Sequence, residues 1–129
     1  GFPTEEEKQF QNTTQLIKHC GFSNVHIFPY SPKKGTPASK MPQVDEKVKK
    51  ERVKILRKQS KEVLFEQLNR KIGKSATILF ESKKKSYTDD YYKVKMVASR
   101  QEKIEKPGSI IDVKVVARKG DLLLAEFQE

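Results

Sequence analysis

The sequence predicts an α+β fold in which a helical first half is followed by a small antiparallel β-barrel. Up to Gly73, apolar residues mostly recur at the three-to-four-residue spacing of amphipathic helices. From Ser75 onward, apolar and polar residues alternate, as in strands that bury one face. A stretch rich in proline and glycine, residues 29–37, interrupts the helical part. The expected order is therefore a helix, a strand, a long helix and a group of short strands.

Composition limits the core and indicates a polyanionic partner. The 129 residues suffice for one ordinary domain or two small ones. Only 35% of them are hydrophobic and 34% are charged, so we expect a modest core. The 27 Lys and Arg exceed the 17 Asp and Glu, and nucleic acid is the commonest partner of such an excess. A solvated, soluble surface is the alternative interpretation of the same charge, which is +5 in each of residues 1–57 and 58–129.

Cysteine usage and hydropathy indicate a cytoplasmic protein. Cys20 is the only cysteine, so no disulfide can form within the chain, in agreement with a reducing compartment. No apolar run approaches the length of a membrane span, and no signal peptide is visible. Because the first residue is Gly1 rather than Met, we expect the chain to be a piece of something longer.

The first helix is expected over residues 4–19. Its start has the pattern of a capping box, in which Thr4 accepts a hydrogen bond from the amide of Glu7 and the Glu7 carboxylate reaches back. The apolar stripe of this helix includes Ile17, and Gly21 is its natural C-terminal stop.

An apolar strand and a basic, proline-rich loop are expected next, in the stretch NVHIFPYSPKKGTP at residues 24–37. The apolar residues of the strand are Val25, Ile27 and Phe28, which we expect to be left partly uncovered. The residues that cannot continue a ladder are Pro29, Pro32, Gly35 and Pro37. A strand that ends in such a loop is typical of the active-site edge of an α/β barrel.

The longest helix is expected from Asp45 to about Ile72, with Gly73 as its stop and a break near residues 59–60 as one option. Its run of Lys and Arg, residues 47–61, indicates either phosphate contact or a solvated face balanced by nearby acids, and we favour the solvated face.

Four or five short strands are expected between Ser75 and Phe127. Tight turns are expected at residues 83–86, at Pro107-Gly108 and at residues 119–121. The alternating apolar sets are Ala76, Ile78 and Phe80, then Tyr92, Val94 and Met96, then Ile111, Val113, Val115 and Ala117. Such strands predict a small barrel of the oligonucleotide-binding (OB) type.

Several stretches, read together, resemble one known family. GFPTEEEKQFQNT, NVHIFPYSPKKGTPASKMPQV and VKKERVKIL resemble the C-terminal part of radical S-adenosylmethionine methylthiotransferases. The FPYS strand end and Lys33-Lys34 look more like the branch that modifies threonylcarbamoyladenosine beside the tRNA anticodon than like the branches acting on isopentenyladenosine or on a ribosomal-protein aspartate. LFE at 79–81, YTDDYYKVKM at 87–96 and the ending GDLLLAEF resemble the RNA-binding TRAM domain.

The resemblance implies a domain order and an activity. Residues 1–57 would end an incomplete radical-SAM barrel, 58–73 would form a connecting helix, and 74–129 would form the OB-like TRAM barrel. An intact member adds a methylthio group to carbon 2 of threonylcarbamoyladenosine, using S-adenosylmethionine and 4Fe-4S clusters. With one cysteine this chain lacks the cluster ligands, so alone we expect it to bind neither cofactor and to be inactive. The alternatives are a stand-alone TRAM-type RNA-binding module and a non-catalytic gene remnant.

The resemblance also implies a set of cofactor-binding residues beside the bound methionine, ribose and adenine. They are Gly1, Phe2, Pro3, Glu5, Phe28, Pro29 and Tyr30. Core packing at a strand end is the alternative for Phe28 and Tyr30, and His26 is more readily explained as a hydrogen-bonded or surface residue. His19 and Cys20 are adjacent but have no third ligand at metal spacing, so we expect no metal site.

The RNA-binding residues follow from their own chemistry, because cations beside aromatic rings bind single-stranded and loop RNA. They are Lys33, Lys34, Lys83, Lys84, Lys85, Tyr87, Tyr91, Lys93 and Lys95. The alternative for the adjacent Tyr92 is that it packs inside with Val94 and Met96. The expected partner is tRNA, bound near its anticodon. The missing N-terminal portion of the same enzyme is a second expected partner, and we expect no binding to a membrane.

Overall fold

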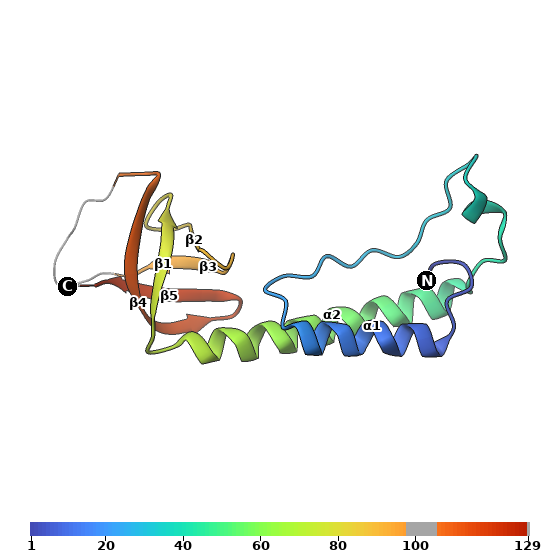
Figure 1. The fold of residues 1–129 in the computed structure, drawn as a ribbon, viewed down its shortest axis with the longest axis horizontal. Helices are drawn as coiled ribbons and strands as arrows, with labels where there is room; N and C mark the ends of the chain where they lie inside the picture. The colour runs from blue at the N-terminus through green and yellow to red at the C-terminus, as the bar shows by residue number, and fades with distance from the viewer. Residues whose placement is uncertain (98–105, 129) are drawn as a thin grey trace. The chain divides into compact units, whose positions relative to one another are not determined.

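The computed structural model describes residues 1–97 and 106–128 and divides the chain into two compact units within them (Figure 1). The first unit is Gly1–Val63 and the second is Leu64–Glu129. Helix α2 (Glu46–Lys71) contributes to both units, so the division falls inside a continuous helix.

Helix α1 (Glu7–Cys20) begins later than the capping box at Thr4 predicts. Glu6 is the N-cap, and its amide donates to Gln9 Oε1 at 3.1 Å. Thr4 is used instead in a turn, in which the Glu5 amide donates to the Phe2 carbonyl at 3.0 Å and Thr4 has φ 74°. The predicted box is therefore wrong. The predicted stop is confirmed, because Gly21 has the left-handed φ of 57°.

The strand predicted at residues 24–28 is not formed. Residues 24–33 carry no regular secondary structure and pair with no strand among the described residues. The alternation of a strand is nevertheless kept, since Val25 and Ile27 are half-buried while His26 and Phe28 are exposed. A strand needs a neighbour to complete its ladder, and the described part of this unit supplies none. A short 3₁₀ helix, η1 (Pro37–Lys40), follows this segment.

Helix α2 is continuous, without the break considered near residue 60. Asp45 Oδ1 accepts from the Lys47 amide at 2.8 Å at its start. Ser60 Oγ donates to the Leu56 carbonyl at 2.8 Å, which keeps this residue within the helix. Gly73, with φ 82°, follows its C-terminal end as predicted.

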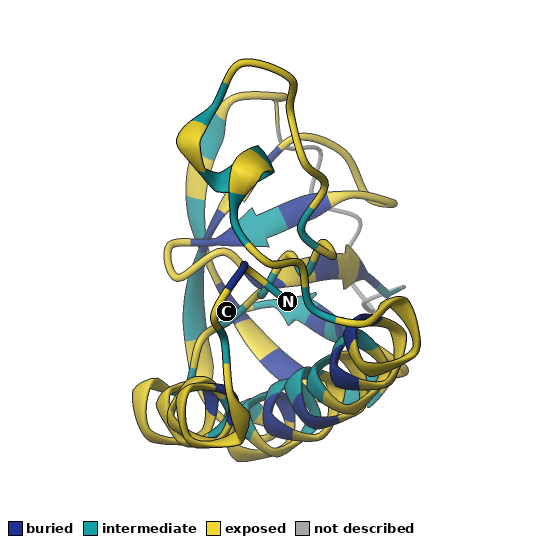
Figure 2. Cartoon of the chain, turned by 90° about the vertical axis from the view of Figure 1, so that its right-hand side faces the viewer, coloured by how far each residue is buried: buried dark blue, intermediate teal, exposed yellow. Residues whose placement is uncertain are grey.

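In the first unit, α1 packs on the N-terminal part of α2 through a mixed interface. Phe10 and Ile17 of α1 are buried. Arg52 of α2 stands over the Phe10 ring, 5.2 Å from its centroid. Gln59 Nε2 donates to the Thr14 carbonyl at 2.6 Å. Figure 2 shows these helices with buried residues along one side of each.

The second unit is a closed β-barrel, which confirms the predicted α+β fold class with an OB-like barrel. Within the described residues its strands are β1 (Ser75–Phe80), β2 (Ser86–Thr88), β3 (Lys93–Met96), β4 (Ser109–Lys119) and β5 (Leu122–Phe127). They close in the order β1-β2-β3-β5-β4, with β3 and β5 parallel and the other pairs antiparallel. The sequence did not distinguish β2, because it is short and follows the turn directly.

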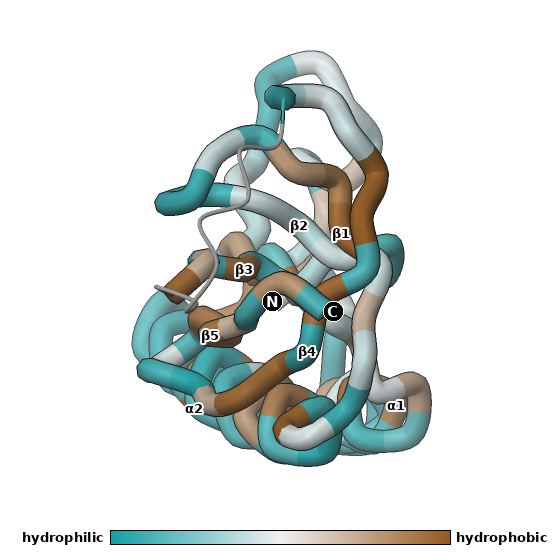
Figure 3. Tube along the Cα trace, turned by 90° about the vertical axis from the view of Figure 1, so that its left-hand side faces the viewer, coloured by the Kyte–Doolittle hydropathy of each residue, from teal (hydrophilic) through white to brown (hydrophobic). Residues whose placement is uncertain are grey.

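The barrel interior is filled by the inward residues of each strand and by the end of α2. This core consists of Leu68, Ile78, Phe80, Tyr92, Val94, Met96, Val113, Val115, Leu123 and Ala125. A register shift between Val115 and Ala117 interrupts the alternation of β4. Figure 3 shows hydrophobic stretches on β1, β4 and β5. Among the described helices, none has the length and apolar character needed to cross a membrane.

Candidate functional site

The cations and tyrosines predicted for RNA binding in the second half lie together on one part of the barrel. We call this the β2–β3 surface: Lys83, Lys84, Lys85, Tyr87, Tyr91, Lys93 and Lys95. Tyr87 of β2 pairs directly with Lys93 of β3, and the Met96 amide donates to the Lys83 carbonyl at 2.8 Å. The antiparallel pairing of β2 with β3 therefore brings the basic turn and the tyrosines onto neighbouring strands.

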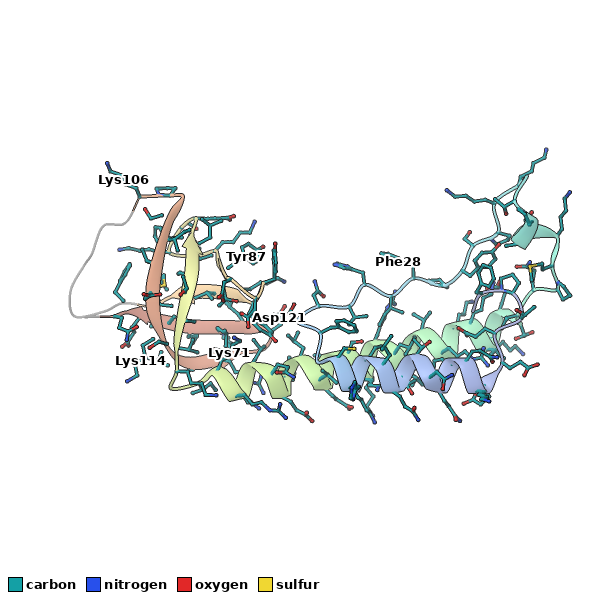
Figure 4. The ribbon with its side chains drawn as sticks, viewed as in Figure 1. Phe28, Lys71, Tyr87, Lys106, Lys114 and Asp121 are labelled. Atoms are coloured by element: carbon teal, nitrogen blue, oxygen red, sulfur yellow. The ribbon has the colours of Figure 1, made fainter. Side chains whose placement is uncertain are left out.

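Strand alternation decides which side chains of this surface face solvent. Ser86 and Thr88 of β2 are buried, so Tyr87 between them points outward. Val94 and Met96 are buried in β3, so Lys93 and Lys95 are exposed. The Tyr87 side chain lies on the outside of the barrel in Figure 4.

The surface keeps an excess of positive charge after its ion pairs are counted. Lys85 Nζ is 3.9 Å from a Glu81 carboxylate oxygen and 5.5 Å from the centroid of the Tyr87 ring. Lys93 Nζ is 3.2 Å from Asp121 Oδ2. Lys83, Lys84 and Lys95 form no ion pair with a carboxylate of the described residues. As far as the described residues go, these three ammonium groups are available to meet phosphates.

A hydrogen-bonded turn from Thr88 to Tyr92 presents Tyr91 to solvent. Thr88 Oγ1 donates to Asp90 Oδ1 at 2.6 Å and accepts from the Tyr92 amide at 2.8 Å. Tyr91 takes the left-handed φ of 66°, uncommon for a bulky residue, and is 79% exposed. Tyr92 is buried in the barrel, so the packing alternative for this residue is confirmed.

Lys71, at the end of α2, holds this turn against the helix. Its Nζ is 2.5 Å from Asp90 Oδ2 and 4.9 Å from the centroid of the Tyr92 ring. Partial burial acts to raise the pKa of Asp90, but hydrogen bonds from Lys71 and Thr88 and the Lys71 charge outweigh it, so the pKa is lowered. Burial, with the Asp90 charge, raises the pKa of Tyr92. This contact could not be predicted from the sequence, because Lys71 and Asp90 lie in different elements.

Part of the predicted cofactor-binding set also comes together, in the first unit. The Phe2 and Tyr30 rings pack edge to face with centroids 5.2 Å apart. Pro3 is buried, and the Gly1 nitrogen lies 3.0 Å from Glu5 Oε1. The Tyr30 hydroxyl is buried and has no hydrogen-bond partner within the described residues.

Phe28 and Pro29 are not drawn into this cluster. Both are exposed on the segment before Tyr30, and Phe28, labelled in Figure 4, is 80% exposed. The packing alternative is therefore wrong for Phe28, and the expectation of uncovered apolar surface is confirmed there. His26 is also exposed, with Nε2 3.3 Å from the Asn24 amide nitrogen, as expected of a surface histidine.

Two cations of α2 support the cluster, although the sequence suggested a solvated face. Arg52 Nη1 donates to the Glu5 carbonyl at 2.9 Å and to Glu5 Oε1 at 2.8 Å. Lys49 is buried, pairs with Glu46, and places its Nζ 3.5 Å from the Tyr30 carbonyl. The solvated-face interpretation is wrong for these two residues, because the Lys49 stem lies against Gly1 and the Arg52 guanidinium stands over the Phe10 ring.

Lys33 and Lys34 lie in a fixed turn of the first unit. The Lys33 carbonyl accepts from Thr36 Oγ1 at 2.8 Å and from the Thr36 amide at 3.2 Å. Gly35 provides the φ of 89° that the turn requires. Both lysines are exposed.

An iron–sulfur cluster does not fit the residues of this chain. Cys20 is exposed, and the described residues contain no group of three or more His, Cys, Asp or Glu side chains that could hold a metal ion.

A closed barrel of OB-like type, attached to a long helix, defines the structural class. No family model matches the chain. The chain is 42% identical over 96 residues to the threonylcarbamoyladenosine tRNA methylthiotransferase MtaB of Rickettsia prowazekii, which is 74% of this chain and 23% of that relative. It is 37% identical over 124 residues to a probable threonylcarbamoyladenosine tRNA methylthiotransferase of Methanocaldococcus jannaschii. This match covers 96% of this chain and 29% of that relative. It is 42% identical over 85 residues to the tRNA-2-methylthio-N(6)-dimethylallyladenosine synthase of Ehrlichia canis. This match covers 65% of this chain and 19% of that relative.

These matches confirm the resemblance to methylthiotransferases. They extend over most of the chain, which spans less than a third of the length of these relatives. The chain is thus similar to one part of such enzymes, and the comparisons do not favour a stand-alone module or a gene remnant.

Proposed function

We propose that the chain is the C-terminal part of a tRNA methylthiotransferase and that its barrel is a TRAM domain that binds tRNA. The observation that carries the proposal is the β2–β3 surface, with unpaired lysines beside outward-facing tyrosines, in a chain similar to enzymes named for tRNA. Lysines supply attraction to phosphates, and exposed rings supply platforms for bases. The tRNA contact is near the anticodon, where the modified adenosine lies.

Threonylcarbamoyladenosine is the modified nucleoside that the similarity supports. Relatives named for this nucleoside match 63–96% of the chain, whereas relatives named for dimethylallyladenosine match 64–66%. The domain order we propose is the end of the catalytic barrel over residues 1–57, a connecting helix over 58–73 and the TRAM domain over 74–129.

The first unit would contribute a wall of the cofactor site. When bound, S-adenosylmethionine supplies the methyl group and, with a reduced 4Fe-4S cluster, the radical that starts the chemistry. Phe2, Glu5 and Tyr30 of this chain would line that wall. Arg52 fixes the orientation of Glu5. The cluster ligands would come from the N-terminal portion of the enzyme, so we expect no catalysis from this chain alone.

The RNA-binding part is tested by charge reversal in the basic turn. We expect the triple variant K83E/K84E/K85E to bind tRNA about tenfold or more weakly, because each lost phosphate contact also removes a released counterion. Binding of the unmodified chain should itself weaken by about tenfold or more between about 50 and about 200 mM salt. Fluorescence anisotropy with labelled tRNA measures both effects.

The matched control is K8E/K50E/K54E, which changes the net charge equally at exposed lysines of α1 and α2. Its affinity should fall much less than that of the turn variant. Equal losses in both variants would locate the attraction in overall charge, and an unchanged affinity of the turn variant would remove the turn from the interface. Absence of tRNA binding at low salt would refute the proposal.

A further inference from the structure

A partly exposed apolar row crosses the outside of the barrel next to the basic turn, with Ile110 and Leu79 exposed and Tyr87 half-buried. Leu79 of β1 pairs with Tyr87 of β2 on one side and with Ile110 of β4 on the other. Tyr87 in turn pairs with Lys93 of β3. We call Ile110, Leu79 and Tyr87 the outer row; directly paired residues of neighbouring strands point to the same face of a sheet, about 5 Å apart.

The outer row takes no part in the barrel core. Ile110 is 74% exposed and Leu79 is 44% exposed, whereas the residues that alternate with them, Ile78 and Phe80, fill the interior. A strand needs one apolar face to be stable, and here that face is already the inner one. Adjacent exposed apolar side chains on a chain with 34% charged residues indicate a surface that a ligand covers.

The charges around the outer row select the kind of ligand. The cations near its strands are Lys83, Lys84, Lys85, Lys93 and Lys106. The acids are Glu81, which faces Lys85, Asp121, which pairs with Lys93, and Asp112, which accepts a hydrogen bond from Thr77 Oγ1 at 2.7 Å. Asp89 and Asp90 follow β2 directly, and Asp90 pairs with Lys71. Figure 4 labels Tyr87, Lys106 and Asp121 on this unit. Lys83 and Lys84 form no ion pair with a described carboxylate, so positive charge is concentrated at the basic turn, which favours a ligand with an apolar face and a negative backbone.

We propose that the outer row binds an unpaired nucleobase, so that the RNA recognised by the barrel is single-stranded. A base presents a flat apolar face that can stack on Tyr87 and cover Leu79 and Ile110. Lys85, which stands over the Tyr87 ring, then meets the phosphate beside that base. A duplex hides its base faces within the stack and reaches the lysines only through phosphates. This inference rests on the proposed tRNA binding and adds the class of RNA.

The test uses the whole chain and two probes, a labelled, unstructured oligoribonucleotide and the same strand annealed to its complement. The double variant L79T/I110T keeps strand-forming side chains but removes the apolar row. We expect it to bind the single strand at least about fivefold more weakly and the duplex unchanged, since stacking on a base is lost but phosphate contacts are kept. Tyr87→Thr should give a similar loss, and Tyr87→Phe, which keeps the ring, should not.

Val116→Thr is the matched control, because Val116 is another partly exposed apolar residue of β4 that lies outside the outer row. Its affinity for both probes should be unchanged, and thermal unfolding of every variant confirms that the barrel is folded. If the double variant unfolds, the comparison of Tyr87→Thr with Tyr87→Phe still tests the inference. A loss of affinity in Tyr87→Phe would assign the role to the hydroxyl instead of the ring.

Several results would overturn the inference. They are an unchanged affinity of L79T/I110T for the single strand, an equal loss for the duplex, or binding of tRNA without binding of the single strand. A dimer of the unmodified chain that L79T/I110T dissociates, with RNA affinity unchanged, would show that a second copy covers the row. The proposed function fails differently, by absence of tRNA binding or by insensitivity to the Lys83–Lys85 reversal.

Discussion

The side chains of Thr88 and Lys71 hold in place the turn that exposes Tyr91. Thr88 closes the turn on both sides of Tyr91, and Lys71 reaches Asp90 from another element. The left-handed backbone of Tyr91 costs roughly 1–2 kcal/mol for a residue with a Cβ atom. Strain of this kind persists where surrounding contacts enforce it, and it gathers at functional sites.

The first prediction concerns the dependence of barrel stability on pH. Asp90 has a lowered pKa in the folded protein, so its stabilising contribution is complete above the unfolded pKa of about 4 and is lost as the pH falls through the lower folded pKa. We expect Asp90→Asn to lower the urea midpoint of unfolding at neutral pH. The difference from the unmodified chain should shrink below about pH 4 and vanish at still lower pH.

Asp89→Asn is the control for this prediction, because Asp89 is the exposed neighbour and only its amide is bonded, to the Thr77 carbonyl at 3.1 Å. Its urea midpoint should follow that of the unmodified chain across the pH range. An Asp90→Asn difference that persists unchanged in acid would mean that the carboxylate charge is not what stabilises the turn.

The sequence was informative about residues on the surface of an element and silent about contacts between elements. Alternation in KVKM predicted that Lys93 and Lys95 are exposed. The burial of Lys49 could not be predicted, because charge alone favours solvent and only the approach of Gly1 and Tyr30 to α2 covers it. Glu5 was singled out, but its partner Arg52 lies 47 residues away.

At the scale of elements, local sequence signals predicted the ends of both helices correctly but predicted the start of α1 wrongly. Glycines at 21 and 73 follow α1 and α2, both with positive φ. The prediction placed the cap at Thr4, but Thr4 belongs to the Phe2–Glu5 turn, so Glu6 is the N-cap and the helix begins later. Residues 24–28 kept the alternation of a strand without forming one, because pairing depends on a partner outside the local pattern.

The second prediction tests how α2 ends. Gly73 has φ 82°, and a Cβ atom at this position would meet nothing within 4 Å, so only backbone strain opposes a side chain. Gly73→Ala should therefore lower the free energy of unfolding by about 1 kcal/mol, and Gly73→Asn by less. Urea unfolding followed by circular dichroism measures both changes.

Lys74→Ala serves as its comparison, because Lys74 is the exposed next residue. Its effect should stay within about 0.5 kcal/mol. Equal stability of Gly73→Ala and the unmodified chain would mean that the turn after α2 relaxes to another conformation without cost.

Considered as a whole, the molecule has an uneven core. The second unit contains a continuous hydrophobic cluster that joins β1, β3, β4 and β5 to Leu68. In the first unit the buried hydrophobic residues are few, among them Phe10, Ile17 and Val63, and polar groups such as Gln59 share the interface. Apolar burial supplies most folding stability, so the barrel should be the more stable unit.

The third prediction follows from this difference. As urea increases, amides of α1 and of the first half of α2 should lose protection from hydrogen exchange at concentrations where β1, β4 and β5 remain protected. Mass spectrometry of exchanged peptides measures the two sets in one sample. Simultaneous loss of protection in both sets would mean that the units unfold cooperatively.

The barrel was predictable from sequence because most of its strands bury one face each, which leaves a clear alternation of apolar and polar residues. The first unit was less predictable, since its apolar segment at residues 24–28 has no ladder within the described chain. The resemblance to a longer enzyme accounts for that failure in physical terms: a pattern suited to a sheet needs the rest of the sheet.

The single thiol gives the molecule a natural point of attachment. Cys20 ends α1, is exposed, and has no competing cysteine anywhere in the sequence. One maleimide-linked dye or spin label will therefore report on the first unit alone, while the clustered tyrosine fluorophores report mainly on the barrel. Titration with RNA can then be followed in both units of the same unmutated molecule.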